Sequence, residues 1–232
     1  MLSLKNVTKT FGTIHAIEGV SFDVADGEFV FLTGPSGAGK TTILRMILRD
    51  LLPDKGEILF EGKDITKFAD RDIPKLRQKI GVVFQDFKVL LERTVSENVE
   101  IALAVIGLPD KEWDIRVKHV LKLVGILDRA DFFPSQLSGG ELQRVSMARA
   151  LVVNPEIILA DEPTGNLDWD TANELMKLFE EVNKEGKSII MATHHRVIVD
   201  TMKKRVIEID KGKVVGRKEA KKGKVKAKKT IK

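Results

Sequence analysis

The chain has 232 residues, of which 43% are hydrophobic, 31% are charged and none is a cysteine. This composition excludes a disordered or collagen-like chain, a disulfide scaffold and a thiolate metal site. The longest stretch without charge, Phe29–Gly39, is interrupted by glycine and proline and is too short to span a bilayer. The first residues lack the apolar run of a secretory signal, so we expect the protein on the cytoplasmic side.

The net charge of +5 is unevenly distributed along the chain. Residues 211–232 hold 11 of the 39 Lys and Arg residues but one of the 34 acidic residues, a charge of +10, whereas the other 210 residues carry −5. The acidic body does not favour nucleic-acid binding. We expect the lysine-rich tail, 217–232, to be a flexible, solubilising end or to contact anionic lipid headgroups.

Strand and helix patterns alternate through most of the chain, which predicts an α/β fold with a largely parallel sheet. Half-buried or buried strands are expected at Leu2–Val7, Gly19–Val24, Phe29–Thr33, Ile80–Phe84, Glu156–Ala160, Ser188–Thr193 and around Arg205–Ile209. Helices are expected at Thr41–Leu48, Val95–Ile106, Glu112–Val124, Gly140–Val152 and Thr171–Lys184.

Three of these helices follow one another without an intervening strand. They indicate a helical block, about 90–153, inserted into a single α/β domain that spans residues 1–216.

A glycine-rich turn joins the strand at Phe29–Thr33 to the following helix. It reads Gly34-Pro35-Ser36-Gly37-Ala38-Gly39-Lys40-Thr41 and matches the phosphate-binding loop pattern G-x-x-x-x-G-K-[ST]. Glycines allow a tight turn whose N–H groups point into one hollow, and the positive end of the helix dipole adds to this anion site. Lys40 would reach the β- and γ-phosphates of a nucleotide, and the Thr41 hydroxyl would bind Mg²⁺. The alternative is an ordinary glycine-rich turn.

Two carboxylates, Asp161 and Glu162, follow the apolar residues Ile157–Ala160. In proteins with a phosphate-binding loop, an acid at the end of a neighbouring strand completes the Mg²⁺ shell, a role that suits Asp161. Glu162 could polarise a water for in-line attack on the γ-phosphate. The alternative is a solvated acidic strand end.

The segment Leu137-Ser138-Gly139-Gly140-Glu141 resembles the signature motif of the ATP-binding cassette (ABC) ATPases. Other motifs of that family follow in its order: Gln85 resembles the Q-loop, Gly165–Asp168 the D-loop and His194 the switch histidine. Phe11 stands where the family places an aromatic ring on adenine. The resemblance spans about Leu2 to Val215.

This resemblance implies an ABC ATPase fold of the P-loop NTPase type, with a RecA-like parallel-sheet core, an antiparallel β subdomain and an inserted helical subdomain. It implies hydrolysis of ATP with Mg²⁺, in a homodimer whose ATP lies between the phosphate-binding loop of one copy and the signature motif of the other. The implied catalytic residues are Glu162, His194, Gln85 and Lys40. The implied ATP contacts are Phe11, Gly34, Pro35, Ser36, Gly37, Ala38, Gly39, Lys40, Thr41 and Thr42.

The implied metal ligands are Thr41, Gln85 and Asp161, and Asp168 would communicate across the dimer. His194 would hold the γ-phosphate and position Glu162, with a satisfied core histidine as the alternative. The signature residues Leu137, Ser138, Gly139, Gly140 and Glu141 would face the partner's ATP.

The residue chemistry of the signature segment supports a second anion site. Ser138 and the two glycines open a helix, so they offer a hydroxyl, free N–H groups and a positive dipole end. A capping box between Ser138 and Glu141 explains the same residues, and both interpretations can hold together.

Three positions differ from the usual family pattern. Glu141 replaces glutamine in the signature motif, His195 stands where aspartate is commoner, and Phe11 replaces tyrosine. None of these changes removes a group that performs chemistry.

Residues 84–99 resemble the cell-division branch of the ABC ATPases. This implies a permease-like integral membrane partner and control of peptidoglycan hydrolases, with Val89–Leu91 near the partner's cytoplasmic helix. One alternative is the ATPase of a lipoprotein-release or macrolide-exporter-like transporter, because the segment Asp161–Asp168 is shared with those proteins. The other is a soluble ABC protein acting on ribosomes or nucleic acid, which the single cassette disfavours.

Overall fold

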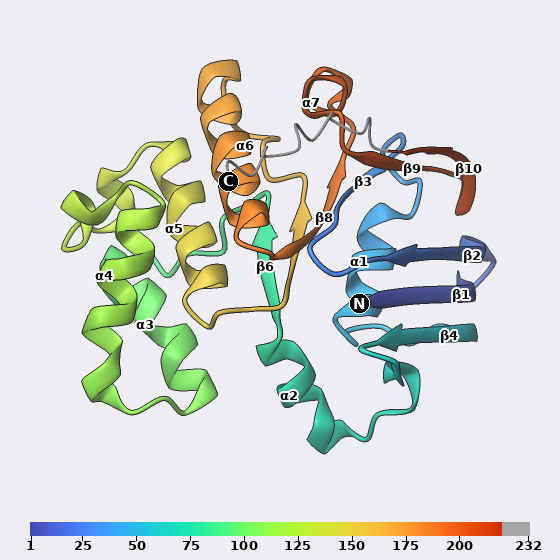
Figure 1. Ribbon diagram of the computed structural model, residues 1–232, viewed down its shortest axis with the longest axis horizontal. Coiled ribbons are helices and arrows are strands. Elements are labelled where there is room, and N and C mark those ends of the chain that lie inside the picture. Colours follow the sequence, from blue (N-terminus) through green and yellow to red (C-terminus); the bar gives the residue numbers. More distant parts are fainter. Residues whose placement is uncertain (220–232) are drawn as a thin grey trace, which may run out of the picture.

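The computed structural model describes residues 1–219, which form two β-sheets with helices between and beside them (Figure 1). The larger sheet has the strand order β10-β9-β3-β8-β7-β6, in which all neighbouring pairs are parallel except β10 and β9. Its strands are β3 (Phe29–Thr33), β6 (Ile80–Phe84), β7 (Ile157–Asp161), β8 (Ser188–Thr193), β9 (Arg205–Asp210) and β10 (Lys213–Lys218).

The smaller sheet is antiparallel and has the order β2-β1-β4-β5. Its strands are β1 (Leu2–Phe11), β2 (Ile14–Val24), β4 (Lys55–Phe60) and β5 (Lys63–Asp64). The apolar residues of β1, β2 and β4 alternate with polar ones and pack in one core together with α1.

Seven α-helices are described in residues 1–219: α1 (Lys40–Ile47), α2 (Ile73–Gln78), α3 (Val95–Ile106), α4 (Trp113–Leu123), α5 (Gly139–Leu151), α6 (Trp169–Lys184) and α7 (Arg196–Met202). Single 3₁₀ turns lie at Ile65–Lys67, Asp70–Asp72, Asp110–Glu112, Leu127–Arg129 and Pro134–Gln136. None of the helices in this part of the chain is long and apolar enough to cross a membrane.

The larger sheet is covered on both faces, which explains its continuous apolar strands. Successive residues of β3 point to opposite faces, so Phe29 and Phe31 join the core formed with α3–α6, whereas Val30 and Leu32 join the core formed with α1 and the smaller sheet. The phosphate-binding turn that follows β3 is therefore anchored between two hydrophobic cores.

The predicted α/β class with a parallel core is confirmed, and each strand and helix expected from the sequence has a counterpart. The pattern did not reveal β4, β5, α2, α7 or β10, which are short or largely polar. Helices α3, α4 and α5 lie together at one side of the molecule (Figure 1). The limits of the inserted helical block, about 90–153, stay a prediction.

The predicted lysine-rich tail starts inside a strand, because β10 extends to Lys218. The remainder of that tail, 220–232, lies outside the described residues.

Candidate functional site

The turn after β3 can only be built with glycine at its first position. Gly34 has φ +148°, and a Cβ there would lie 2.0 Å from the carbonyl oxygen of Ile209. The turn ends at Gly39, which caps α1 with φ +106° and offers no side-chain hydrogen bond to the helix. The first N–H groups of α1 are therefore available to an anion, at the positive end of the helix dipole.

Lys40 is buried, at 6% exposure, yet its charge is well surrounded by oxygen. Its Nζ donates to the carbonyl oxygens of Gly34 (2.8 Å) and Pro35 (3.1 Å). Nζ also lies 3.5 Å from Oε1 of Glu162. The ammonium is thus held over the turn, where a phosphate oxygen could replace the carboxylate as its partner.

Asp161 ends β7 with a largely buried carboxylate. Its Oδ1 has no hydrogen-bond partner among residues 1–219. Burial raises the pKa of Asp161, and the nearby Glu162 carboxylate acts in the same direction, against the Thr41 hydroxyl and the Lys40 ammonium. An unpaired buried carboxylate oxygen close to a hydroxyl is a donor set that suits a hard cation such as Mg²⁺.

Glu162 is held against His194. Its Oε1 lies 2.9 Å from Nδ1 of His194, and its Oε2 accepts the His194 backbone N–H at 3.3 Å. The residue has φ +47°, and its own N–H donates to the carbonyl oxygen of Ala192 at 2.9 Å. This places the carboxylate at the ends of β7 and β8, with its side chain 15% exposed.

Gln85 follows β6 and forms a reciprocal amide pair with Asn166. Gln85 Nε2 donates to Asn166 Oδ1 (3.3 Å), and Asn166 Nδ2 donates to the Gln85 carbonyl oxygen (3.0 Å). The close approach requires glycine beside it, because a Cβ on Gly165 would lie 2.8 Å from Gln85 Nε2. The loop after β6 is thereby joined to the loop after β7.

These strand ends open into one cavity of about 1060 Å³. The structure brings twelve of the predicted site residues together in its lining: Pro35, Ser36, Gly37, Ala38, Gly39, Lys40, Thr41, Thr42, Gln85, Asp161, Glu162 and His194. Ile14, His15 and Asn166 are among the further lining residues that the sequence interpretation missed. Asn166 stands inside the D-loop-like segment and could have been suspected from that place, whereas nothing in the local pattern singles out the other two.

Phe11 lies outside the lining of this cavity. It ends β1, is 43% exposed, and has the Lys9 Nζ 5.5 Å from its ring centroid. Ile14 and His15, from the same hairpin, line the cavity instead, and Ile14 is 68% exposed.

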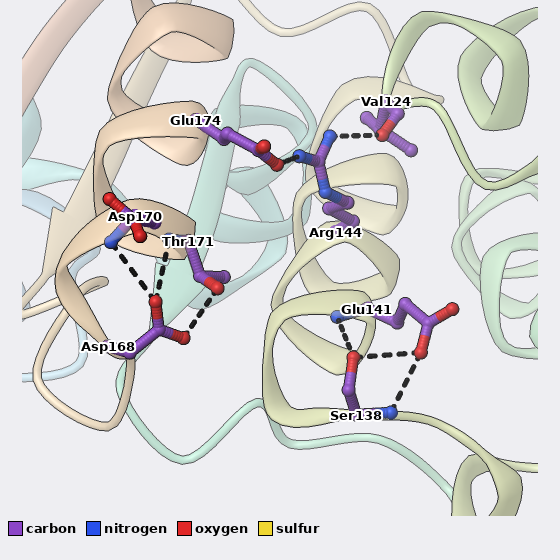
Figure 2. Close-up of polar contacts among 8 residues, drawn as sticks. All are labelled: Val124, Ser138, Glu141, Arg144, Asp168, Asp170, Thr171 and Glu174. Atoms are coloured by element: carbon purple, nitrogen blue, oxygen red, sulfur yellow. Dashed lines mark hydrogen bonds and ion pairs between the residues drawn. The ribbon is translucent and has the colours of Figure 1, made fainter.

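The signature segment also lies outside the cavity lining. Ser138 caps α5 in a capping box with Glu141: its Oγ accepts the Glu141 N–H (3.3 Å), and Glu141 Oε2 accepts the Ser138 N–H and hydroxyl (2.8 Å each) (Figure 2). The hydrogen bond from the Ser138 N–H, followed by that from the Ser138 hydroxyl, lowers the pKa of Glu141. The Arg129 guanidinium, whose Nε lies 3.0 Å from Glu141 Oε1, acts in the same direction.

Asp168 caps α6 close to the signature helix. Its Oδ1 accepts the N–H groups of Asp170 (3.1 Å) and Thr171 (3.0 Å), and its Oδ2 accepts the Thr171 hydroxyl (2.6 Å) (Figure 2). A Cβ on Gly140 would lie 2.4 Å from Thr171 Cγ2. The first turns of α5 and α6 are therefore in direct contact.

Residues 17–165 match the family model described as ABC transporter. The chain is 51% identical over 216 residues to the cell division ATP-binding protein FtsE of Bacillus subtilis, covering 93% of this chain and 95% of the relative. It is 44% identical to FtsE of Escherichia coli, with 93% and 98% covered.

Two solved structures share the fold at appreciable identity. A dimeric ABC cassette, MJ0796, bound to ADP and Pi in a post-hydrolysis state has a TM-score of 0.86 at 36% identity, covering 96% of this chain and all of that one. A dimeric structure of MJ0796, a bacterial ABC transporter cassette, has the same TM-score and coverage at 37% identity.

Proposed function

The chain belongs to the ABC transporter family, alongside the FtsE proteins, and on that premise we propose that it is the ATP-hydrolysing subunit of a cell-division ABC complex. The observation that carries this proposal is the convergence at one sheet edge of the phosphate-binding turn, Asp161, Glu162 and His194. These four groups come from the ends of three strands, β3, β7 and β8, that are distant in sequence. Together they supply an anion cradle, a metal-binding oxygen and a base.

The reaction joins the oxygen of a water molecule to the γ-phosphorus of ATP and breaks the bond to the β-phosphate oxygen, releasing ADP and phosphate. Lys40 and the N–H groups at the start of α1 hold the phosphates and balance charge in the transition state. Glu162 takes up the proton of the attacking water, and His194 keeps this carboxylate oriented through its Nδ1 and N–H contacts.

Mg²⁺ fits the oxygen donors of Thr41, Asp161 and Gln85, of which the Asp161 carboxylate has an unpaired oxygen. When bound, the cation neutralises charge that develops on the phosphate oxygens. Among residues 1–219 no compact group of three His, Asp or Glu side chains forms a metal site without the nucleotide.

The functional unit is a homodimer. Ser138 and the start of α5 form a second helix terminus suited to anions, but they do not line the cavity of their own chain. A two-fold pair with ATP at the interface gives each nucleotide a phosphate-binding turn from one copy and a signature segment from the other. Asp168, which caps the adjoining start of α6, would communicate across this dimer.

The membrane partner is a permease-like protein of the FtsX type, and the complex controls peptidoglycan hydrolases across the membrane. Its contact includes Val89–Leu91, where Leu90 is 44% and Leu91 is 63% exposed. The chain would then work as a peripheral protein at the cytoplasmic face of the membrane. The lysine-rich tail would add contact with anionic lipid.

Phosphate release from Mg²⁺-ATP by the purified chain tests the enzymatic part of this proposal. Because two copies form each site, the rate per chain should rise with chain concentration at saturating ATP. EDTA should abolish release. No phosphate release by the chain, either alone or co-expressed with its membrane partner, would contradict the proposed ATPase.

Co-purification tests the partner. The chain should bind a four-span membrane protein with a large outer loop, and charged substitutions at Val89–Leu91 should remove that binding. If the chain instead captured a lipoprotein-release or exporter permease, the cell-division assignment would be contradicted and the chain would be a transporter ATPase.

A further inference from the structure

The loop between β6 and α3 is held by side chains in place of a backbone ladder. Its backbone oxygens accept hydrogen bonds from four side chains. Gln143 donates to the carbonyl of Phe84 (3.1 Å) and Asn166 to that of Gln85 (3.0 Å). Arg149 donates to the carbonyls of Phe87 and Lys88, and Asn98 to that of Leu90 (3.0 Å). This is the loop that carries Gln85 into the cavity and presents Val89–Leu91 at the surface. The side chains that donate to these backbone oxygens therefore couple a displacement of the loop to the rest of the molecule.

The middle of the loop has an unusual backbone. Phe87 and Lys88 are consecutive and have φ values of +57° and +54°. L-residues avoid this left-handed region, so two in succession persist only where the surrounding structure holds them. Within the loop the Lys88 N–H donates to the carbonyl oxygen of Asp86, and from outside the loop one guanidinium binds the carbonyl oxygens of both residues.

Arg149 provides that hold from α5. Its two terminal nitrogens donate to the carbonyl oxygens of Phe87 (3.0 Å) and Lys88 (2.5 Å). No carboxylate among residues 1–219 forms an ion pair with Arg149, so its charge is directed at these two carbonyls. A planar fork with several donors can serve two neighbouring oxygens, which the single ammonium of lysine does less well.

The same loop also touches the opposite end of α5. A Cβ on Gly139 would lie 3.9 Å from Cζ of Phe87, so the Phe87 ring lies beside the first signature glycine. Phe87 is thus joined to α5 twice, through its ring at the start of the helix and through its carbonyl at Arg149, ten residues later. A shift of the loop cannot leave the helix unaffected unless these contacts break.

We propose that Arg149 is a positioning residue that locks the loop at 85–90 to the signature helix, so that displacement of the loop by the membrane partner is carried to Ser138. This rests on the proposed ATPase and its partner. Asn98, fully buried on α3, fixes the far end of the loop by also accepting the Leu90 N–H at 2.7 Å. The segment between the two anchors is thus tied to α5 through Arg149 and to α3 through Asn98.

The test compares Arg149→Lys with Arg144→Lys. Arg144 is a matched control, because it lies on the same helix and also donates to a backbone oxygen, that of Val124 (2.8 Å). Its other hydrogen bond goes to the Glu174 carboxylate (2.8 Å), and within residues 1–219 it forms none with the loop. The first measurement is amide hydrogen exchange of the purified chain. In Arg149→Lys we expect exchange to rise about tenfold in peptides covering 85–94, the size expected from one charge-assisted hydrogen bond, and to stay unchanged there in Arg144→Lys.

The second measurement separates nucleotide binding from turnover. Arg149→Lys should keep its affinity for ATP within about twofold and lose about tenfold in kcat, because the phosphate-binding turn is untouched while the signature helix is released. Unchanged exchange at 85–94, or a rise spread evenly over the chain, would overturn the proposal, and so would equal losses of kcat in both variants. Absence of ATPase activity in the unchanged protein would refute the proposed function instead, and the exchange data would still decide the role of Arg149.

Discussion

The ammonium of Lys40 lies 3.5 Å from the carboxylate of Glu162, although the strands that carry these residues are not neighbours. Lys40 follows β3 and Glu162 follows β7, and β8 lies between them. Both side chains reach across the end of β8, whose next residue, His194, completes the group. The carboxyl ends of three parallel strands thus assemble one charged cluster over the phosphate-binding turn.

Glu162→Gln should keep ATP binding and lower turnover by about 100-fold or more, because the amide cannot accept the proton of the attacking water. The substituted chain should then accumulate as an ATP-bound dimer. Single-turnover phosphate release and size-exclusion chromatography with ATP measure both effects. Glu181→Gln, on the exposed surface of α6, is the control and should behave like the unchanged protein. Normal turnover in Glu162→Gln would exclude Glu162 as the base.

Lys40→Ala should weaken ATP binding itself, by about tenfold or more, since it removes the cation that faces the β- and γ-phosphates. Titration with a fluorescent ATP analogue measures the affinity without requiring hydrolysis. The exposed Lys184→Ala on α6 serves as the control for loss of one positive charge. An unchanged affinity in Lys40→Ala would refute the assignment of the phosphate-binding loop.

Gly140→Ala should destabilise the chain by about 1–3 kcal/mol, because the new methyl group would meet Thr171 Cγ2 at 2.4 Å. Thr171→Ser removes that methyl group and keeps the hydroxyl that donates to Asp168. We therefore expect the double variant to recover most of the lost stability. Urea unfolding of the unchanged protein, the two single variants and the double variant measures these stabilities. A double variant no more stable than Gly140→Ala would show that the contact between α5 and α6 does not cause the loss of stability.

Glu141→Gln tests the electrostatic part of the cap on α5. The folded protein lowers the pKa of Glu141 below its ordinary value of 4.5, so the charged carboxylate stabilises the fold above pH 4.5, and this contribution is lost as the pH falls through the lowered pKa. At pH 7 the unchanged protein should be more stable than Glu141→Gln by about 0.5–1 kcal/mol.

The free energies of unfolding of these two proteins should converge as the pH falls below the lowered pKa of Glu141. Urea unfolding between pH 7 and pH 3 gives the comparison. A difference that does not depend on pH would mean that the carboxylate charge contributes nothing to the cap, and that only its hydrogen-bond geometry matters.

The sequence by itself determined the local pieces of this protein. A buried run followed by Gly34–Thr41 specifies a strand, a phosphate-binding turn and a helix, because the glycines, the lysine and the apolar period act over a few residues. The same holds for the cap at Ser138 and for the acidic end of β7. These features depend on short-range geometry, so their residue types and spacing are sufficient to predict them.

Only the tertiary structure decided which of these pieces meet. The insertion of β8 between β3 and β7, the place of Phe11 outside the cavity lining that holds Ile14 and His15, and the grip of Arg149 on the loop after β6 all join residues far apart in the chain. Such contacts are selected by the packing of two cores and by the need to pair buried polar groups. No local pattern encodes them, because their partners are separated by whole elements of the fold.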